Sequence, residues 1–95
     1  MTPRVETVRV NLERLGALNW ARRFARDRGA PLNECITPGC RDPRIMRARN
    51  ALMCVLGDTL GLSDGEVSRA LLIDRSWVNR ARKARRAELA REYAR

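Results

Sequence analysis

The feature that most restricts the fold of this chain is a pair of helix-start signals eleven residues apart, at Ser63 and Asp74. Ser63 begins a capping box, in which its side chain accepts from the backbone N–H of Glu66 and the Glu66 carboxylate accepts from the N–H of Ser63. Asp74 can cap a second helix. A short helix that ends near Leu72, a tight turn and a second helix with a basic flank are typical of a helix-turn-helix. We therefore expect such a pair of helices within residues 63–83.

The apolar residues of this segment fit two helices that pack on each other. Val67 and Val78 fall on the inner faces of the two helices, where they would pack together and fix the crossing angle. Ser68 is small, as a close approach of the helices requires. Leu71 and Ala81 complete the predicted inner surface.

The outward side of the second helix is predicted to meet DNA. Its flexible polar and basic side chains can donate to a base edge or a phosphate, and Trp77 can donate from its indole N–H or stack. An ordinary pair of surface helices is the alternative. We favour DNA recognition, because a Trp among arginines at a helix start is poorly explained as core. The predicted outward residues are Arg75, Ser76, Trp77, Asn79, Arg80 and Lys83.

The net charge of +9 comes from 20 Lys and Arg against 11 Asp and Glu. Residues 75–95 carry eight basic and two acidic residues, a net charge of +6, whereas residues 41–74 carry five of each. Frequent Arg codons would explain the excess of arginine but not its position. A polyanion-binding protein has a use for such a stretch, because Lys and Arg displace condensed counterions from phosphates. We expect phosphate contacts from residues 80–86 and a solvated helix over residues 88–95.

The N-terminal part is predicted to be helical as well. Thr2 and Pro3 can begin a helix, and Gly16 then interrupts the pattern, which leaves either one kinked helix to about Arg28 or two short ones. The apolar stripe of this part can pack on the chain's own domain or pair with a second copy, and both remain open here. The stripe consists of Val5, Val8, Leu12 and Leu15.

A loop and a further helix connect these two parts. Residues 29–43 hold three Pro and two Gly and are predicted to be a loop. Asp42 and Pro43 can cap a helix that runs to about Leu60 and ends at Gly61. We therefore predict an all-α chain of four to five helices.

A length of 95 residues allows one domain rather than two. Within it, we divide the chain into an N-terminal helical segment and loop at residues 1–40 and a helix-turn-helix DNA-binding domain at residues 41–95.

Several classes of protein are disfavoured. The odd number of Cys and the lack of a secretion signal predict reduced thiols in the cytoplasm, and no apolar run approaches the roughly 20 residues that span a membrane. The chain has no His, no clustered carboxylates and no phosphate loop, so we expect no enzyme, no catalytic residue and no cofactor. Cys35, Cys40 and Cys54 fall short of the four ligands of a zinc site, so no metal is expected.

Three stretches of residues 47–83 resemble the C-terminal DNA-binding domain of the bacterial replication initiator DnaA. In that family an Arg-Pro-Arg-Gln-like stretch opens a long helix, a Leu-Ser-x-x-Glu-Ile segment follows, and an Asp-His/Arg-Thr-Thr-Val stretch begins a basic helix. The resemblance covers about forty of the 95 residues. The matching stretches are Arg47-Ala48-Arg49-Asn50, Gly61-Leu62-Ser63-Asp64-Gly65-Glu66-Val67 and Asp74-Arg75-Ser76-Trp77-Val78.

The resemblance implies two DNA-contacting elements. Arg47, with Arg49 beside it, corresponds to the arginine region that enters the minor groove, and Asp74 to Trp77 correspond to the stretch that reads bases in the major groove. An Asp can accept from a cytosine amino group, an Arg can form a fork with guanine, and a Trp edge can contact a thymine methyl group.

The departures from the family are also informative. Leu72 and Ile73 replace the Gly and Arg of the turn, and Ser76 and Trp77 replace the two Thr. Ninety-five residues leave no room for the ATPase domain of an initiator. The resemblance therefore points to a small standalone bacterial or phage-related protein that carries only the reading domain, such as a transcription activator of a phage or a gene transfer agent.

These observations together predict a transcription regulator, most readily an activator, that binds double-stranded DNA in the cytoplasm at the nucleoid. Its specific affinity would be roughly 10⁻⁸ M or weaker for a monomer and would fall steeply with salt. The alternatives are a non-specific architectural or replication-control DNA-binding protein, or an adaptor. In each case the N-terminal helices of this chain could contact RNA polymerase or another protein, and the chain could form a homodimer.

Overall fold

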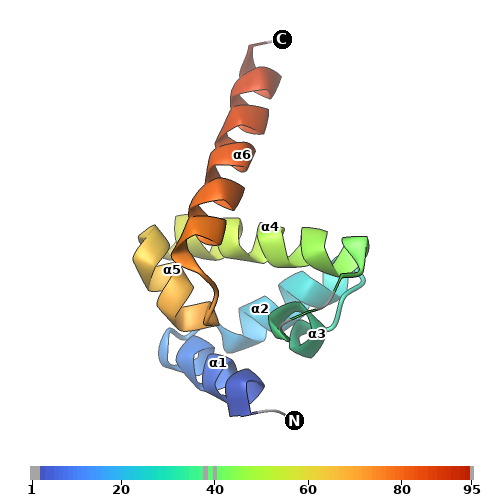
Figure 1. Cartoon of the computed structure of the whole chain (residues 1–95), viewed down its shortest axis with the longest axis vertical. Helices are drawn as coiled ribbons and strands as arrows, with labels where there is room; N and C mark the ends of the chain where they lie inside the picture. The colour runs from blue at the N-terminus through green and yellow to red at the C-terminus, as the bar shows by residue number, and fades with distance from the viewer. Residues whose placement is uncertain (1–2, 38, 40, 95) are drawn as a thin grey trace.

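A computed structural model describes residues 3–37, 39 and 41–94 of the chain. This described part is helical and holds no strand (Figure 1), so the all-α prediction is confirmed. The proposed cap Thr2 lies outside it. The helices are α1 (Pro3–Arg14), α2 (Leu18–Asp27), α3 (Leu32–Ile36), α4 (Pro43–Leu60), α5 (Asp64–Leu71) and α6 (Arg75–Tyr93).

The N-terminal part forms two helices rather than one kinked helix. Gly16 has a φ of 70°, a left-handed conformation that glycine adopts without steric cost. The N–H of Ala17 then bonds to the carbonyl of Leu12 at 2.9 Å, which closes the end of α1. The next helix starts at Leu18 on a new axis.

The predicted loop at residues 29–43 contains a short helix, α3, which the sequence analysis did not anticipate. Its side chains Leu32, Cys35 and Ile36 have spacings of three and four residues and are all buried. Pro31 at its start and Thr37 at its end confine it to five residues. A count of Pro and Gly missed this one-turn pattern, so the described chain has six helices instead of four or five.

The predicted helix boundaries of the second half are confirmed. The Asp42 side chain accepts from the N–H of Arg44 at 2.9 Å, with Pro43 in the first position of α4, and Gly61 ends this helix with a φ of 67°. In the capping box, the N–H of Glu66 donates to Ser63 Oγ at 3.2 Å and the N–H of Ser63 donates to Glu66 Oε1 at 3.0 Å.

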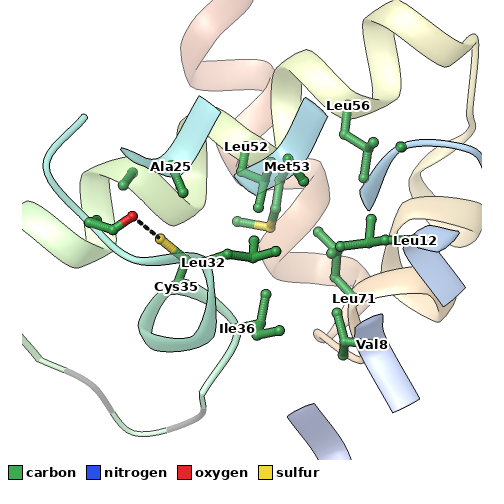
Figure 2. Close-up of a cluster of buried hydrophobic side chains, with 14 of the residues drawn as sticks. Val8, Leu12, Ala25, Leu32, Cys35, Ile36, Leu52, Met53, Leu56 and Leu71 are labelled. Atoms are coloured by element: carbon green, nitrogen blue, oxygen red, sulfur yellow. Dashed lines mark hydrogen bonds between the residues drawn. The ribbon is translucent and has the colours of Figure 1, made fainter. Parts of the chain in front are cut away.

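One hydrophobic core joins the two parts of the chain. Val5, Val8 and Leu12 of α1 are at most 3% exposed and belong to the same buried cluster as residues of α4, α5 and α6. Figure 2 shows Val8 and Leu12 beside Leu71 of α5, with Leu56 of α4 close by. The N-terminal apolar stripe is therefore covered within the chain for these three residues, whereas Leu15 is 38% exposed.

The last helix extends beyond the rest of the molecule. The first half of α6 packs on α4 and α5, and its second half projects away from the body toward the C-terminus (Figure 1). The longest dimension of the molecule is accordingly 44 Å, against 26 and 23 Å for the other two. Exposed side chains cover α6 from residue 86 onward.

Candidate nucleic-acid interface

The turn between α5 and α6 is closed by hydrogen bonds to one serine. Leu72 has a φ of 54°, which costs a residue with a side chain roughly 1 kcal/mol. The N–H groups of Leu72 and Ile73 both donate to the carbonyl of Ser68, and the Ser68 hydroxyl donates to the carbonyl of Ile73. Ser68 thus does more than allow a close approach, because it fixes the turn that sets the direction of α6.

The predicted inner face of the helix pair is confirmed. Val67 of α5 and Val78 of α6 are both 0% exposed, and Leu71 is 1% exposed. Ala81 packs partly against the same core. These side chains set how α6 lies against α5.

Arg82 connects α6 to α4 and α5 through a nearly buried guanidinium group. Its Nη1 donates to the carbonyl of Leu62 and to Asp64 Oδ1, both at 3.0 Å, and its Nη2 donates to Asp58 Oδ1 at 3.1 Å. The Arg82 side chain is only 11% exposed. The expectation of phosphate contacts from residues 80–86 is therefore wrong for Arg82, because the protein's own carboxylates occupy its guanidinium.

Gly57 of α4 leaves the space that Arg82 needs. A Cβ on Gly57 would lie 3.0 Å from Arg82 Cζ and 3.2 Å from Val67 Cγ2, closer than ordinary van der Waals contact. The sequence gives no direct signal for this residue, since a mid-helix glycine usually only weakens a helix.

The first turn of α6 begins with the predicted cap. Asp74 Oδ1 accepts from the N–H of Ser76 at 2.8 Å and from the Ser76 hydroxyl at 2.5 Å. These hydrogen bonds from Ser76 stabilise the charged carboxylate and lower the pKa of Asp74. Both residues are exposed, so the cap and its partner share the surface on which DNA contacts were predicted.

Trp77 is half-buried and contributes to the packing of α6, contrary to the argument that core packing explains it poorly. Its ring packs against the hydrophobic core, and its indole Nε1 donates to Asn50 Oδ1 of α4 at 3.1 Å. The guanidinium of Arg49 lies 5.7 Å from the centre of the ring, within the range of a cation–π contact. The indole N–H is thus already bonded within the protein.

Asn79 also points toward the protein. Its Nδ2 donates to Asp64 Oδ2 at 2.8 Å. This bond, together with the nearby Arg82, outweighs the effect of burial and lowers the pKa of Asp64. Asp64 therefore holds two side chains of α6 at the start of α5.

The two arginines assigned to the minor groove lie in different environments. Arg49 is 5% exposed, and its Nε and Nη2 donate to the carbonyls of Cys35 and Thr37 at 2.5 and 2.7 Å. The prediction that Arg49 faces DNA is therefore wrong for this structure, because its guanidinium ties the end of α3 to α4. Arg47 is exposed and lines a groove of about 320 Å³ between α4 and α6, next to Ala81.

The remaining predicted side chains form an exposed surface on α6. Ser76, Arg80 and Lys83 are exposed at spacings of four and three residues, so they lie on one face of the helix. Arg75 is exposed on the edge that faces α5. In the described part of the chain, Arg75, Arg80 and Lys83 have no carboxylate within 4.0 Å.

The structure also places the cysteines and bears on metal and membrane sites. Cys35 and Cys54 are buried, and burial raises the pKa of the Cys54 thiol. Cys40 lies outside the described residues. Among the residues that are described, no three Cys, Asp or Glu side chains could hold a metal ion together. No helix over the same ranges is long and apolar enough to cross a membrane.

Known proteins give no direct assignment for this chain. No protein-family model matches it, and neither a curated protein nor a solved structure does so. The assignment of a function therefore depends on the geometry of α5 and α6 and on the resemblance in residues 47–83.

Proposed function

We propose that this chain is a sequence-specific double-stranded DNA-binding protein that inserts α6 into the major groove and acts as a transcription regulator. The observation that carries the proposal is the division of α6 into two faces. Arg82 and Val78 attach one face to α4 and α5, while Ser76, Arg80 and Lys83 leave the opposite face exposed and rich in donors. A major groove of about 12 Å admits one helix that presents such a face.

The proposal agrees with the DnaA resemblance and gives a reason for one departure from it. Where the family has a small Thr, Trp77 supplies a ring that packs on the core and bonds to Asn50. We therefore assign Trp77 to the packing of α6 and not to base recognition. The proposed base-reading side chains accordingly are Ser76, Arg80 and Lys83, with Arg47 as the candidate contact from α4.

A non-specific DNA-binding protein is the second candidate, and one observation favours it. Several predicted reading groups are already used inside the protein: Asn79 bonds to Asp64, Trp77 bonds to Asn50, and Asp74 caps α6. Over residues 75–86 the exposed side chains of this helix are mainly cations, which neutralise phosphates of any sequence. This candidate predicts equal affinity for all duplexes.

Selection from random duplexes by the purified protein at about 0.15 M salt tests the two candidates. Sequence-specific recognition predicts a motif that weakens or changes with Arg80→Ala and with Lys83→Ala, each of which removes one base contact at a cost of about 1–3 kcal/mol. Arg23→Ala on α2 is the matched control, since it removes an exposed arginine outside the helix pair. Recovery of random sequences by the unmodified protein would support the second candidate instead.

The same proposal has three further parts. The chain activates transcription, it lies at the nucleoid, and its N-terminal helices contact RNA polymerase. The exposed faces of α1 and α2 leave room for a protein contact, because α4 lies between α2 and α6. A reporter with the selected motif upstream of a promoter tests the sign of regulation. Increased expression supports an activator, and reduced expression supports a repressor.

A further inference from the structure

Two arginine side chains from different helices meet above Gly65 in α5. Arg69 Nη1 lies 3.6 Å and Arg75 Cζ lies 4.0 Å from the position that a Cβ on Gly65 would occupy. Arg69 belongs to α5 and Arg75 to the first turn of α6. Both side chains are exposed.

The local structure explains why the two side chains meet there. Side chains of an α-helix tilt toward its N-terminus, so Arg69 extends over the residue four positions before it, which is Gly65. The turn closed by Ser68 brings Arg75 back beside α5. Because Gly65 has no side chain, both guanidinium groups can lie over it, one from α5 itself and the other from α6.

Arg69 attracts the Glu66 carboxylate, but neither Arg69 nor Arg75 forms an ion pair within the described part of the chain. No carboxylate of the described residues lies within 4.0 Å of either guanidinium. The carboxylates nearest to them in the chain already accept other bonds. Glu66 accepts from the N–H of Ser63, and Asp64 accepts from Arg82. Asp74, which directly precedes Arg75, accepts from the N–H and the hydroxyl of Ser76. Two like charges that share one position on the surface repel each other, and an anion between them would remove that repulsion.

We propose that Arg69 and Arg75 together bind one backbone phosphate of DNA. A guanidinium group can donate two parallel hydrogen bonds to phosphate oxygens, so two such groups can hold one phosphodiester between them. The proposal rests on the proposed DNA binding and adds Arg69, which was not among the predicted contacts. It also assigns Arg75 to the DNA backbone instead of to a base. A backbone contact suits Arg69, because the first helix of a helix-turn-helix crosses the DNA backbone.

Salt dependence of duplex binding gives the decisive measurement. Fluorescence anisotropy with one labelled duplex of arbitrary sequence, between about 0.05 and 0.2 M salt, compares the unmodified protein with Arg69→Ala, Arg75→Ala and the double variant. Each neutralised phosphate contributes about 0.9 to the slope of log affinity against log salt concentration. One shared phosphate predicts that the double variant loses about 0.9 of slope, and two separate phosphates predict a loss of about 1.8.

Affinities and a third variant complete the test. Each single substitution should weaken binding about tenfold for every sequence, and the double variant should weaken it clearly less than the product of the two, because the residues share one partner. Gly65→Leu keeps both arginines but fills the space between them, and should cause the same loss of slope. Arg23→Ala on α2 is the control, and thermal unfolding shows that all variants are folded.

The outcomes separate this proposal from the proposed function. An unchanged slope in the double variant, or a loss of about 1.8 with multiplicative affinities, would overturn the shared phosphate while a selected motif still supported sequence-specific recognition. The expected loss of about 0.9 with no motif in the selection would support the phosphate site and overturn specific recognition. Failure of the unmodified protein to bind any duplex would overturn both.

Discussion

Two arginine-rich helices, α2 and α6, use this residue in different ways. On α2, Arg22, Arg23 and Arg26 are all exposed, and the small residues Ala21 and Ala25 form the buried face. On α6 the same residue type lies on both sides: the nearly buried Arg82 pairs with two carboxylates, and other arginines are exposed. Of these two helices, α6 is the one that has ion pairs to its neighbours on one side and exposed basic residues on the other.

This difference shows that the number of arginines in a helix says little about its role. Arg28 stacks on Phe24 with 3.7 Å to the ring centre, and the ring centres of Phe24 and Trp20 lie 5.1 Å apart. The two aromatic side chains of α2 thus contact each other and the end of their own helix, as well as the core. The corresponding aromatic residue of α6, Trp77, bonds across to α4 instead. The position of α6 is thus specified by contacts with other helices, which a reading helix requires.

The largest expected effect comes from charge reversal at three exposed basic residues of α6, compared with the same reversal on α2. Changing Arg75, Arg80 and Lys83 to Glu should weaken duplex binding more than about 100-fold at 0.15 M salt, because cations that meet phosphates become repulsive anions. The same net change on α2, with Arg22, Arg23 and Arg26 replaced by Glu, should change affinity less than about threefold, since those groups are screened beyond about 8 Å. Anisotropy titration of both variants measures the difference, and equal losses would show that total charge and not position governs binding.

A smaller effect is expected on stability when the buried arginine of α6 is removed. Arg82→Ala leaves Asp64, whose side chain is 19% exposed, without its guanidinium partner and should lower the free energy of unfolding by about 3 kcal/mol. Asp58 adds little, because its side chain is 58% exposed.

Urea denaturation of Arg82→Ala and of the control Arg26→Ala on α2 checks this prediction. The control removes an exposed arginine and should change stability by no more than about 0.5 kcal/mol. If both variants lost the same small amount of stability, the two helices would not differ in how they use arginine.

The comparison also shows which features the sequence made predictable. The capping box at Ser63, the cap at Asp74 and the glycine at position 61 each depend on a few neighbouring residues, so local chemistry alone placed the boundaries of α4, α5 and α6. Val67 and Val78 were identified as inner residues for the same reason, because helical periodicity separates the two faces of each helix.

The roles of individual arginines could not be predicted in this way. Arg49 and Arg82 find their partners 12 to 24 residues away along the chain, at the carbonyl of Thr37 and the carboxylate of Asp58 among others. Whether an arginine faces DNA or a carbonyl depends on which segment packs over it, and α3, the segment over Arg49, was itself missed. Resemblance to a family did not supply this information, since it matches residue types and not their packing.

Replacing one tryptophan on each helix by phenylalanine tests whether α6 depends more than α2 on a bond from its tryptophan. Trp77→Phe keeps an aromatic ring on α6 but removes the N–H that donates to Asn50, and should lower the free energy of unfolding by about 1 kcal/mol. Trp20→Phe on α2 keeps the stacked pair with Phe24 and should cost less. Thermal unfolding of the two variants and of Asn50→Ala checks this, and a larger loss for Trp20→Phe would contradict the anchoring role of Trp77.

The smallest expected effect is an acid sensitivity confined to α5 and α6. Glu66 completes the capping box of α5 and Asp74 caps α6, and hydrogen bonds from Ser63 and Ser76 lower the pKa values of the two carboxylates. Because these pKa values are lower in the folded chain than in the unfolded chain, the caps stabilise fully above the ordinary carboxylate range near pH 4 and are lost as the pH falls through their lowered values. No side chain caps α2, whose start at Ala17 offers none.

Hydrogen exchange of backbone amides between pH 6 and pH 3 tests this difference, with each rate corrected for the intrinsic effect of pH. The amides in the first turns of α5 and α6 should lose protection on acidification, whereas those of α2 should keep theirs until the whole chain unfolds. Asp74→Asn retains a capping oxygen but cannot titrate, so it should make the first turn of α6 insensitive to pH while α5 still responds. A loss of protection at the same pH in all three helices would mean that acid acts on the fold as a whole, and that the caps of the reading helix carry no separate share of its stability.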